Sequence, residues 1–451
     1  MTNVFSNDTC YEIILFISDD YEFILRNFVL VCKQWLEIVI GNPLIHIKNP
    51  KIQKGNPFAS CFLSVQYTPC YIASPVVVFN DKWVESLKEM KNLEKLDISN
   101  NNITNENIKQ ISKIPTLKYL VTDINQVNDQ GARYISEIKG LKKLSLSYND
   151  VTDQGIEYIS KLSELSELNV DRNQFTVKGL GYITKMRNIS VLRLCCSFRC
   201  NEGVKIISEM TKLSTLNISN NKITCIQHIE NLKNLTYLNI SDNDIGKIDN
   251  ITKLKNLKHL HMNSCNIKYE NIHTIIQLKQ LKTLSIDNNP IGNEGFMILC
   301  NMDQLTVLSI CKCGIIFEKS SNIEKMMNLN RLRLSGNYIS KEFVIHLQKL
   351  NKLRYLCMRN CKLDHSSIQY IPGLKQLIFL DVQNNTTCKK SYDIMCKIKL
   401  KYIYFDRYCA NEETLNRYKT NIHILDKIIT LFKKIQQHSW RGTIIKLFCI
   451  N

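Results

Sequence analysis

The sequence predicts an α/β solenoid, with a parallel β-sheet along the concave side and short helices on the convex side. Three observations lead to this fold class. A leucine pattern recurs at nearly constant spacing, apolar residues alternate within each copy, and further apolar residues follow at three-residue steps. One copy could not bury so many apolar side chains alone, so neighbouring copies must stack.

The repeat has the form LxxLxLxxNxI and is first complete at Leu93. Its copies start 24 residues apart, except for two steps of 22 residues that lead to Leu235 and Leu257. A weaker copy near Leu400 brings the array to about 14 units. The other copies start at Leu117, Leu141, Leu165, Ile189, Leu213, Leu281, Leu305, Leu329, Leu353 and Leu377.

The two central leucines of each copy predict a short strand. Side chains alternate along a strand, so Leu-x-Leu places both leucines on one face, towards the core. A recurring asparagine, first at Asn101, is expected to pair buried backbone groups where the chain turns. Cysteine, which is small and tolerates burial, replaces this asparagine at Cys265, Cys313 and Cys361.

The residues after each strand predict a short helix. Ile108, Ile111 and Ile114 are three residues apart, as on one face of a helical turn. Glycines such as Gly155 and Gly179 are expected where the strand turns into the helix, because glycine tolerates unusual backbone angles.

Composition narrows the class of protein. Only 15 of the 451 residues are glycine and 8 are proline, which disfavours fibrous or linker-rich chains. No apolar run approaches the roughly 18 residues that span a membrane, and Met1–Cys10 has no secretory signal pattern. The 18 cysteines are therefore interpreted as reduced. We expect a cytoplasmic or nuclear protein.

The 24-residue unit resembles the leucine-rich repeats of the ribonuclease-inhibitor and GALA types. This resemblance covers residues 93–420 and implies a horseshoe whose concave sheet binds other proteins. Residues 46–92 hold four prolines and are interpreted as an irregular connector with a degenerate first repeat. Residues 421–451 contain a basic amphipathic helix that is expected to cap the last repeat, the alternative being a membrane surface or a partner's groove.

Residues 1–45 do not carry the repeat and form two short amphipathic helical patterns. The stretch Phe28–Trp35 contains Val-Cys-Lys-x-Trp and resembles the second half of an F-box, although the usual Leu-Pro opening is missing. The resemblance implies docking to the Skp-type adaptor of a cullin–RING ubiquitin ligase. The residues that would pack or dock are Phe5, Ile13, Val31, Cys32 and Trp35. The alternative is a plain hydrophobic cap, which every solenoid needs.

Outward-facing strand residues suggest where a partner binds. Most are small and polar, but arginines and aromatic residues gather in the last copies, and these residue types often anchor protein interfaces. The candidate partner-binding residues are Arg331, Arg333, Tyr355, Arg359, Phe379, Tyr402 and Tyr404. Single-stranded nucleic acid is a weaker alternative for this surface, because acidic residues interrupt its positive charge.

No phosphate-binding loop, zinc module or nucleophile motif is found in the sequence. We therefore expect no catalytic residue, metal or cofactor. The sequence predicts a non-catalytic adaptor, most simply the substrate-recognition subunit of an SCF-type ligase that holds an unknown target protein. A repeat scaffold or inhibitor without a role in ubiquitin transfer is the alternative.

Overall fold

The computed structural model describes residues 47–48, 64–66, 92–317, 322–385, 390–391, 394, 400 and 402–404. The described residues divide between Asn289 and Pro290 into two compact units, called here the N-terminal unit and the C-terminal unit. The F-box-like module predicted in residues 1–45, with its five docking residues, lies outside the described residues, as does the predicted cap in 421–451.

The N-terminal unit contains one strand for each repeat, and each strand pairs in parallel with the next along the chain. The first two strands lie in residues 46–92, for which the sequence predicts a connector and a degenerate repeat. The strands are β1 (Ile47–Lys48), β2 (Ser64–Gln66), β3 (Lys95–Asp97), β4 (Tyr119–Val121), β5 (Lys143–Ser145), β6 (Glu167–Asn169), β7 (Val191–Arg193), β8 (Thr215–Asn217), β9 (Tyr237–Asn239), β10 (His259–His261) and β11 (Thr283–Ser285).

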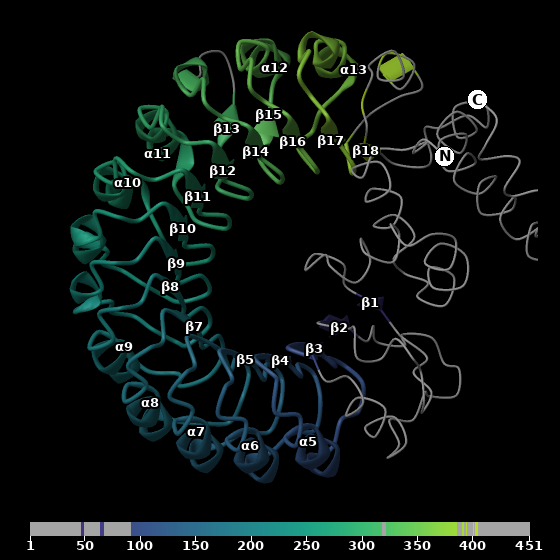
Figure 1. The fold of residues 1–451 in the computed structure, drawn as a ribbon. Helices are drawn as coiled ribbons and strands as arrows, with labels where there is room; N and C mark the ends of the chain where they lie inside the picture. Colours follow the sequence, from purple (N-terminus) through teal and green to yellow (C-terminus); the bar gives the residue numbers. More distant parts are fainter. Residues whose placement is uncertain are drawn as a thin grey trace, which may run out of the picture. The chain divides into compact units, whose positions relative to one another are not determined.

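Short helices follow the strands of this unit and lie on the opposite side of the repeats (Figure 1). The two repeats of 22 residues contain 3-10 helices instead of α-helices, because the missing residues leave too little chain for a full α-helical segment. The helices are α5 (Asn105–Ile111), α6 (Asp129–Ile135), α7 (Asp153–Ile159), α8 (Val177–Ile183), α9 (Glu202–Ile207), η3 (Ile229–Asn231), η4 (Asp249–Lys253) and α10 (Tyr269–Ile275).

The C-terminal unit follows the same plan. Its parallel strands are β12 (Val307–Ser309), β14 (Arg331–Arg333), β16 (Tyr355–Cys357), β17 (Phe379–Asp381) and β18 (Tyr402–Tyr404). Two further strands, β13 (Ile316–Phe317) and β15 (Tyr338–Ile339), pair with each other. The helices are α11 (Gly292–Leu299), η5 (Asn322–Lys325), α12 (Lys341–Leu347), α13 (His365–Ile368) and η6 (Ile371–Gly373).

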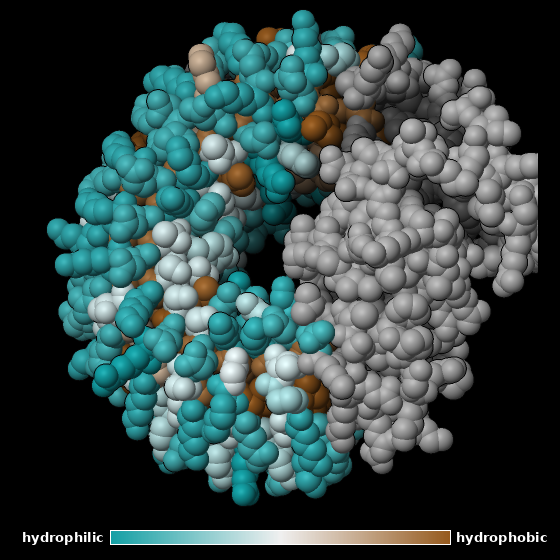
Figure 2. All heavy atoms as spheres, in the orientation of Figure 1, coloured by the Kyte–Doolittle hydropathy of each residue, from teal (hydrophilic) through white to brown (hydrophobic). Residues whose placement is uncertain are grey.

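The repeated leucines form a continuous apolar core between strands and helices in each unit. Leu96 in β3 and Ile98 after it are at most 1% exposed, and Ile108 and Ile111 in α5 are fully buried. Hydrophilic side chains cover most of the visible surface, with hydrophobic ones in small separate areas (Figure 2). The predicted fold class, a solenoid with a parallel sheet and short helices, is confirmed.

The recurring asparagine pairs buried backbone groups at the turns, as predicted, and these groups belong to the preceding repeat. The Asn221 side chain is fully buried. Its oxygen accepts hydrogen bonds from the backbone N–H groups of Ser197 (2.8 Å) and Arg199 (3.3 Å), and its amide nitrogen donates to the carbonyl of Leu194 (2.7 Å). Where cysteine replaces asparagine, the Cys265 thiol donates to the carbonyl of Ile240 (3.2 Å). Buried backbone groups at the turns are thus paired between repeats.

The expected role of the glycines is wrong. Gly155 and Gly179 lie inside helices α7 and α8, not at the turn from strand to helix. A Cβ on Gly155 would lie 2.4 Å from Oδ1 of Asp129 in the preceding repeat. That carboxylate accepts hydrogen bonds from the backbone N–H groups of Gly155 (2.9 Å) and Thr152 (2.7 Å) at the start of α7. Glycine is needed because the neighbouring repeat caps the helix at close range.

Candidate functional site

In strands β3–β12, β14, β16 and β17 the central residue is buried, and the first and third residues lie on the face of the sheet that points away from the helices. In the C-terminal unit these residues form rows across the strands, because the register is unbroken from β12 to β18. One row contains Val307, Arg331, Tyr355, Phe379 and Tyr402. The next contains Ser309, Arg333, Cys357, Asp381 and Tyr404. Adjacent residues in a row are about 4.8 Å apart, the spacing between paired strands.

Aromatic side chains stack along three neighbouring strands of this surface. The ring centres of Tyr355 and Phe379 are 6.0 Å apart, and those of Phe379 and Tyr404 are 5.4 Å apart. The Arg331 guanidinium lies over the Tyr355 ring, 4.4 Å from its centre. Tyr404 is 48% exposed. The rings and the guanidinium hold one another in place, so little side-chain entropy remains to be lost when a partner binds.

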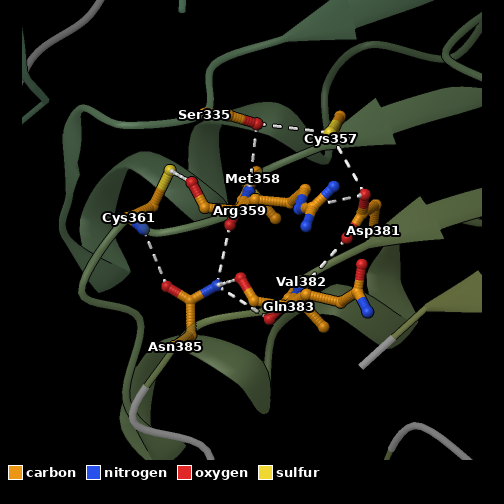
Figure 3. Close-up of polar contacts among 9 residues, drawn as sticks. All are labelled: Ser335, Cys357, Met358, Arg359, Cys361, Asp381, Val382, Gln383 and Asn385. Carbon is orange, nitrogen blue, oxygen red and sulfur yellow. Dashed lines mark hydrogen bonds and ion pairs between the residues drawn. The ribbon is translucent and has the colours of Figure 1, made fainter. Parts of the chain in front are cut away.

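A polar network links Ser335, Cys357, Arg359 and Asp381 across neighbouring repeats (Figure 3). Asp381 is largely buried, and its Oδ2 is 3.7 Å from Nε of Arg359 and 3.6 Å from the thiol of Cys357. The Ser335 hydroxyl lies 3.2 Å from that thiol and accepts a hydrogen bond from the backbone N–H of Arg359 (3.1 Å). Burial raises the pKa of Cys357, and the nearby Asp381 carboxylate raises it further. The thiol is therefore protonated at neutral pH, which suits a hydrogen-bond donor more than a nucleophile.

The structure brings most of the predicted partner-binding residues together. Their backbones lie on β14, β16, β17 and β18, or directly after β16 in the case of Arg359. We call six of them the Arg–aromatic patch: Arg331, Arg333, Tyr355, Arg359, Phe379 and Tyr404. Tyr402 pairs with Phe379 in the strand register.

Sequence reasoning missed the link that Ser335 and Cys357 make to Asp381. Ser335 and Cys357 are 22 residues apart, and Cys357 and Asp381 are 24 apart. The second of these intervals is the period of the repeat, so Cys357 and Asp381 occupy the same position in adjacent repeats. That spacing was the available signal, but it does not reveal which pairs of small polar side chains are in contact.

The N-terminal unit presents a different, partly acidic surface on its strands. Burial raises the pKa of Asp171 to about 6, although the backbone N–H of Cys195 donates a hydrogen bond to its carboxylate and Arg193 lies nearby. Burial likewise raises the pKa of Asp123, opposed by hydrogen bonds from the Ser145 hydroxyl (2.6 Å) and from a backbone N–H. These carboxylates connect neighbouring repeats.

Comparison with protein-family models agrees with the strand and helix pattern. A model described as two copies of leucine-rich repeats matches residues 211–253 and 233–275, and a single leucine-rich repeat model matches residues 89–110 and 141–160. The matched segments of the chain are leucine-rich repeats. None of the matching models is an F-box model.

The solved structures that match this fold are only about 20% identical to this chain in sequence. An internalin from Listeria monocytogenes is 20% identical, with a TM-score of 0.47, over 72% of this chain and 83% of its own. A leucine-rich-repeat protein from Leptospira interrogans is 19% identical, with a TM-score of 0.49, over 77% of this chain and 96% of its own. A sequence search of curated proteins gives no match.

The part of the chain that the structure describes has neither a membrane-spanning helix nor a metal-binding cluster. No helix in it is long and apolar enough to cross a membrane. Within the same residues, no three histidine, cysteine, aspartate or glutamate side chains are placed to share a metal ion. The Arg–aromatic patch therefore remains the candidate site with the most geometric support.

Proposed function

We propose that the chain is the substrate-recognition subunit of an SCF-type cullin–RING ubiquitin ligase. In this proposal residues 1–45 dock the Skp-type adaptor, and the sheet of the leucine-rich repeats holds a target protein. The chain itself does not catalyse formation of the covalent bond between ubiquitin and the target. It raises the effective concentration of a target lysine near the conjugating enzyme. Such a ligase would place it in the cytoplasm or nucleus.

The Arg–aromatic patch is the observation that carries the protein-binding part of the proposal. Arginine and aromatic side chains dominate the energetics of protein interfaces, and here they are clustered on a rigid sheet. Arg331 is stacked on Tyr355 and Arg359 is paired with Asp381, so neither must be ordered on binding. The support for the ligase part is the Val31-Cys32-Lys-x-Trp35 stretch and its place ahead of a repeat array.

The alternative is a leucine-rich-repeat scaffold or inhibitor that occupies its partner without promoting ubiquitin transfer. The match of family models to the repeats alone, with none to an F-box, favours this alternative. Both functions use the same sheet surface, so they differ only in what residues 1–45 bind.

Co-purification with a purified Skp-type adaptor separates the two functions. The full-length chain should retain the adaptor, and Val31→Asp with Trp35→Ala should abolish retention. Arg333→Glu serves as the matched control, because it alters the sheet surface and should leave adaptor binding unchanged. A wild-type chain that never retains the adaptor would refute the ligase role and leave the scaffold function.

A further inference from the structure

The described residues do not neutralise all the positive charges of the Arg–aromatic patch. Arg359 faces the Asp381 carboxylate at 3.7 Å. Within the described residues, no ion pair involves Arg331 or Arg333. Both are exposed, because the two ends of β14 point away from the core. With respect to the described part of the chain, the two guanidinium groups on β14 are exposed and form no ion pair.

Apolar surface lies next to these two charges. Phe379 is two strands away from Arg331 in the same row and lies between the rings of Tyr355 and Tyr404. On the other side of β14, the neighbouring residues Val307 and Ser309 are uncharged and small. A ligand for this surface must combine negative charge with an apolar group a short distance away.

We propose that the Arg–aromatic patch binds an acidic segment of a partner protein. Carboxylates of that segment pair with Arg331 and Arg333, and an apolar or aromatic side chain packs against Phe379. Guanidinium groups match carboxylates with two parallel hydrogen bonds, which gives geometric selectivity as well as attraction. This inference rests on the proposed function, because it assumes that the sheet surface binds protein.

A protein segment fits the charge pattern better than a nucleic acid does. Binding of a single strand without sequence preference uses a groove of positive charge that follows the phosphates from strand to strand. Here the unpaired charge is confined to β14, and the row through Arg333 reaches the largely buried Asp381 carboxylate two strands further on. The phosphates of a nucleic acid that continued along that row would be repelled by the Asp381 carboxylate. One or two carboxylates of a protein segment could pair with Arg331 and Arg333 without reaching Asp381.

Fluorescence anisotropy with the full-length chain tests this proposal. The probe is a fluorescein-labelled random copolymer of glutamate and tyrosine, and the comparison probes are a lysine–tyrosine copolymer and oligothymidylate. We expect the acidic copolymer to bind most tightly and to weaken as salt is added. Arg331→Glu with Arg333→Glu should weaken binding at least tenfold, because attraction becomes repulsion at both sites. The double lysine variant should be intermediate, since lysine keeps the charge without the bidentate geometry.

The chain offers a matched control pair in the N-terminal unit. The Arg172 guanidinium lies 4.8 Å from the centre of the exposed Tyr148 ring, in the same kind of stacked contact. Arg172→Glu with Tyr148→Ala should leave binding of the acidic copolymer within about twofold of the wild type, because neither residue belongs to the Arg–aromatic patch and one exposed charge contributes little on its own.

Three results would overturn the proposal. They are unchanged binding by the Arg331→Glu, Arg333→Glu variant, equal binding of the lysine–tyrosine copolymer, and tighter binding of oligothymidylate that the same variant abolishes. The last result would assign the surface to nucleic acid. None of them affects retention of the Skp-type adaptor, so failure here is distinguishable from failure of the ligase role.

Discussion

The guanidinium carbon of Arg331 lies over the Tyr355 ring, 4.4 Å from its centre, although the two residues belong to different repeats. Strand pairing sets this contact, because Arg331 and Tyr355 are direct partners in the register of β14 and β16. The contact orders the arginine before any partner arrives. Its removal should therefore affect binding more than stability.

Replacing Tyr355 by leucine should weaken partner binding about two- to fivefold, the loss expected for one exposed cation–π contact. The affinity of the full-length chain for the glutamate–tyrosine copolymer measures this effect. Tyr355→Phe keeps the ring face and should bind like the wild type. If the leucine variant binds as tightly as the phenylalanine variant, the stacked arginine does not contribute to recognition.

Replacing Asn221 by alanine should lower the free energy of unfolding by about 2 to 4 kcal/mol, because it leaves buried N–H and C=O groups without partners. Urea denaturation followed by circular dichroism gives the value. Asn221→Cys should cost less, since cysteine occupies the equivalent position at Cys265 and donates its thiol to a carbonyl there. Equal losses in the two variants would show that the thiol does not substitute for the amide.

Two glycine substitutions in neighbouring helices should have opposite effects. Gly155→Ala should destabilise by about 1 to 3 kcal/mol, because the new methyl group overlaps Asp129 Oδ1 and Val151 Cγ1 at 2.4 and 2.6 Å. Gly181→Ala in α8 meets nothing within 4 Å and should stabilise by about 0.5 to 1 kcal/mol, through reduced freedom of the unfolded chain. Thermal unfolding of the two variants checks the contrast, and a shift of the same sign in both would contradict it.

Asp171 should make the chain less stable as the pH rises from about 4 to 7. Burial raises its pKa in the fold to about 6 from an ordinary value of 3.8, so the folded state binds the proton more tightly than the unfolded state does. The resulting stabilisation is present below pH 4 and is lost as the pH passes through 6, with an upper limit of about 3 kcal/mol. Asp171→Asn should flatten this part of the curve of unfolding free energy against pH. A variant curve parallel to that of the wild type would show that the carboxyl titrates normally.

The sequence was sufficient to predict those features that depend on one repeat alone. Leu-x-Leu predicted each short strand, and the burial of Leu96 follows from alternation. The asparagine positions also predicted that Asn221 pairs buried backbone groups, but not that these groups belong to the preceding repeat. Features that depend on two repeats were harder to predict. The need for Gly155 comes from a carboxylate 26 residues earlier, and only the stacked structure shows that the two meet.

For the candidate site, the sequence predicted which strands and which face carry the residues, but not their side-chain contacts. Alternation along strands placed Arg331 and Tyr355 on one face, and the constant period placed them on adjacent strands. The period does not determine side-chain rotamers. It therefore could not show that Arg359 forms an ion pair with Asp381, whereas Arg331 and Arg333 form none with any described residue. That difference in charge pairing decides what kind of ligand the surface fits.

The two 3-10 helices of the N-terminal unit have a mechanical consequence. Packed α-helices need about 8 to 10 Å between their axes, whereas paired strands need only about 4.8 Å, and this mismatch bends a sheet away from its helices. Beside β8 and β9 the slimmer η3 and η4 reduce the mismatch. We therefore expect that stretch of the unit to be flatter than its neighbours and to fit a broad, gently rounded molecule without deformation.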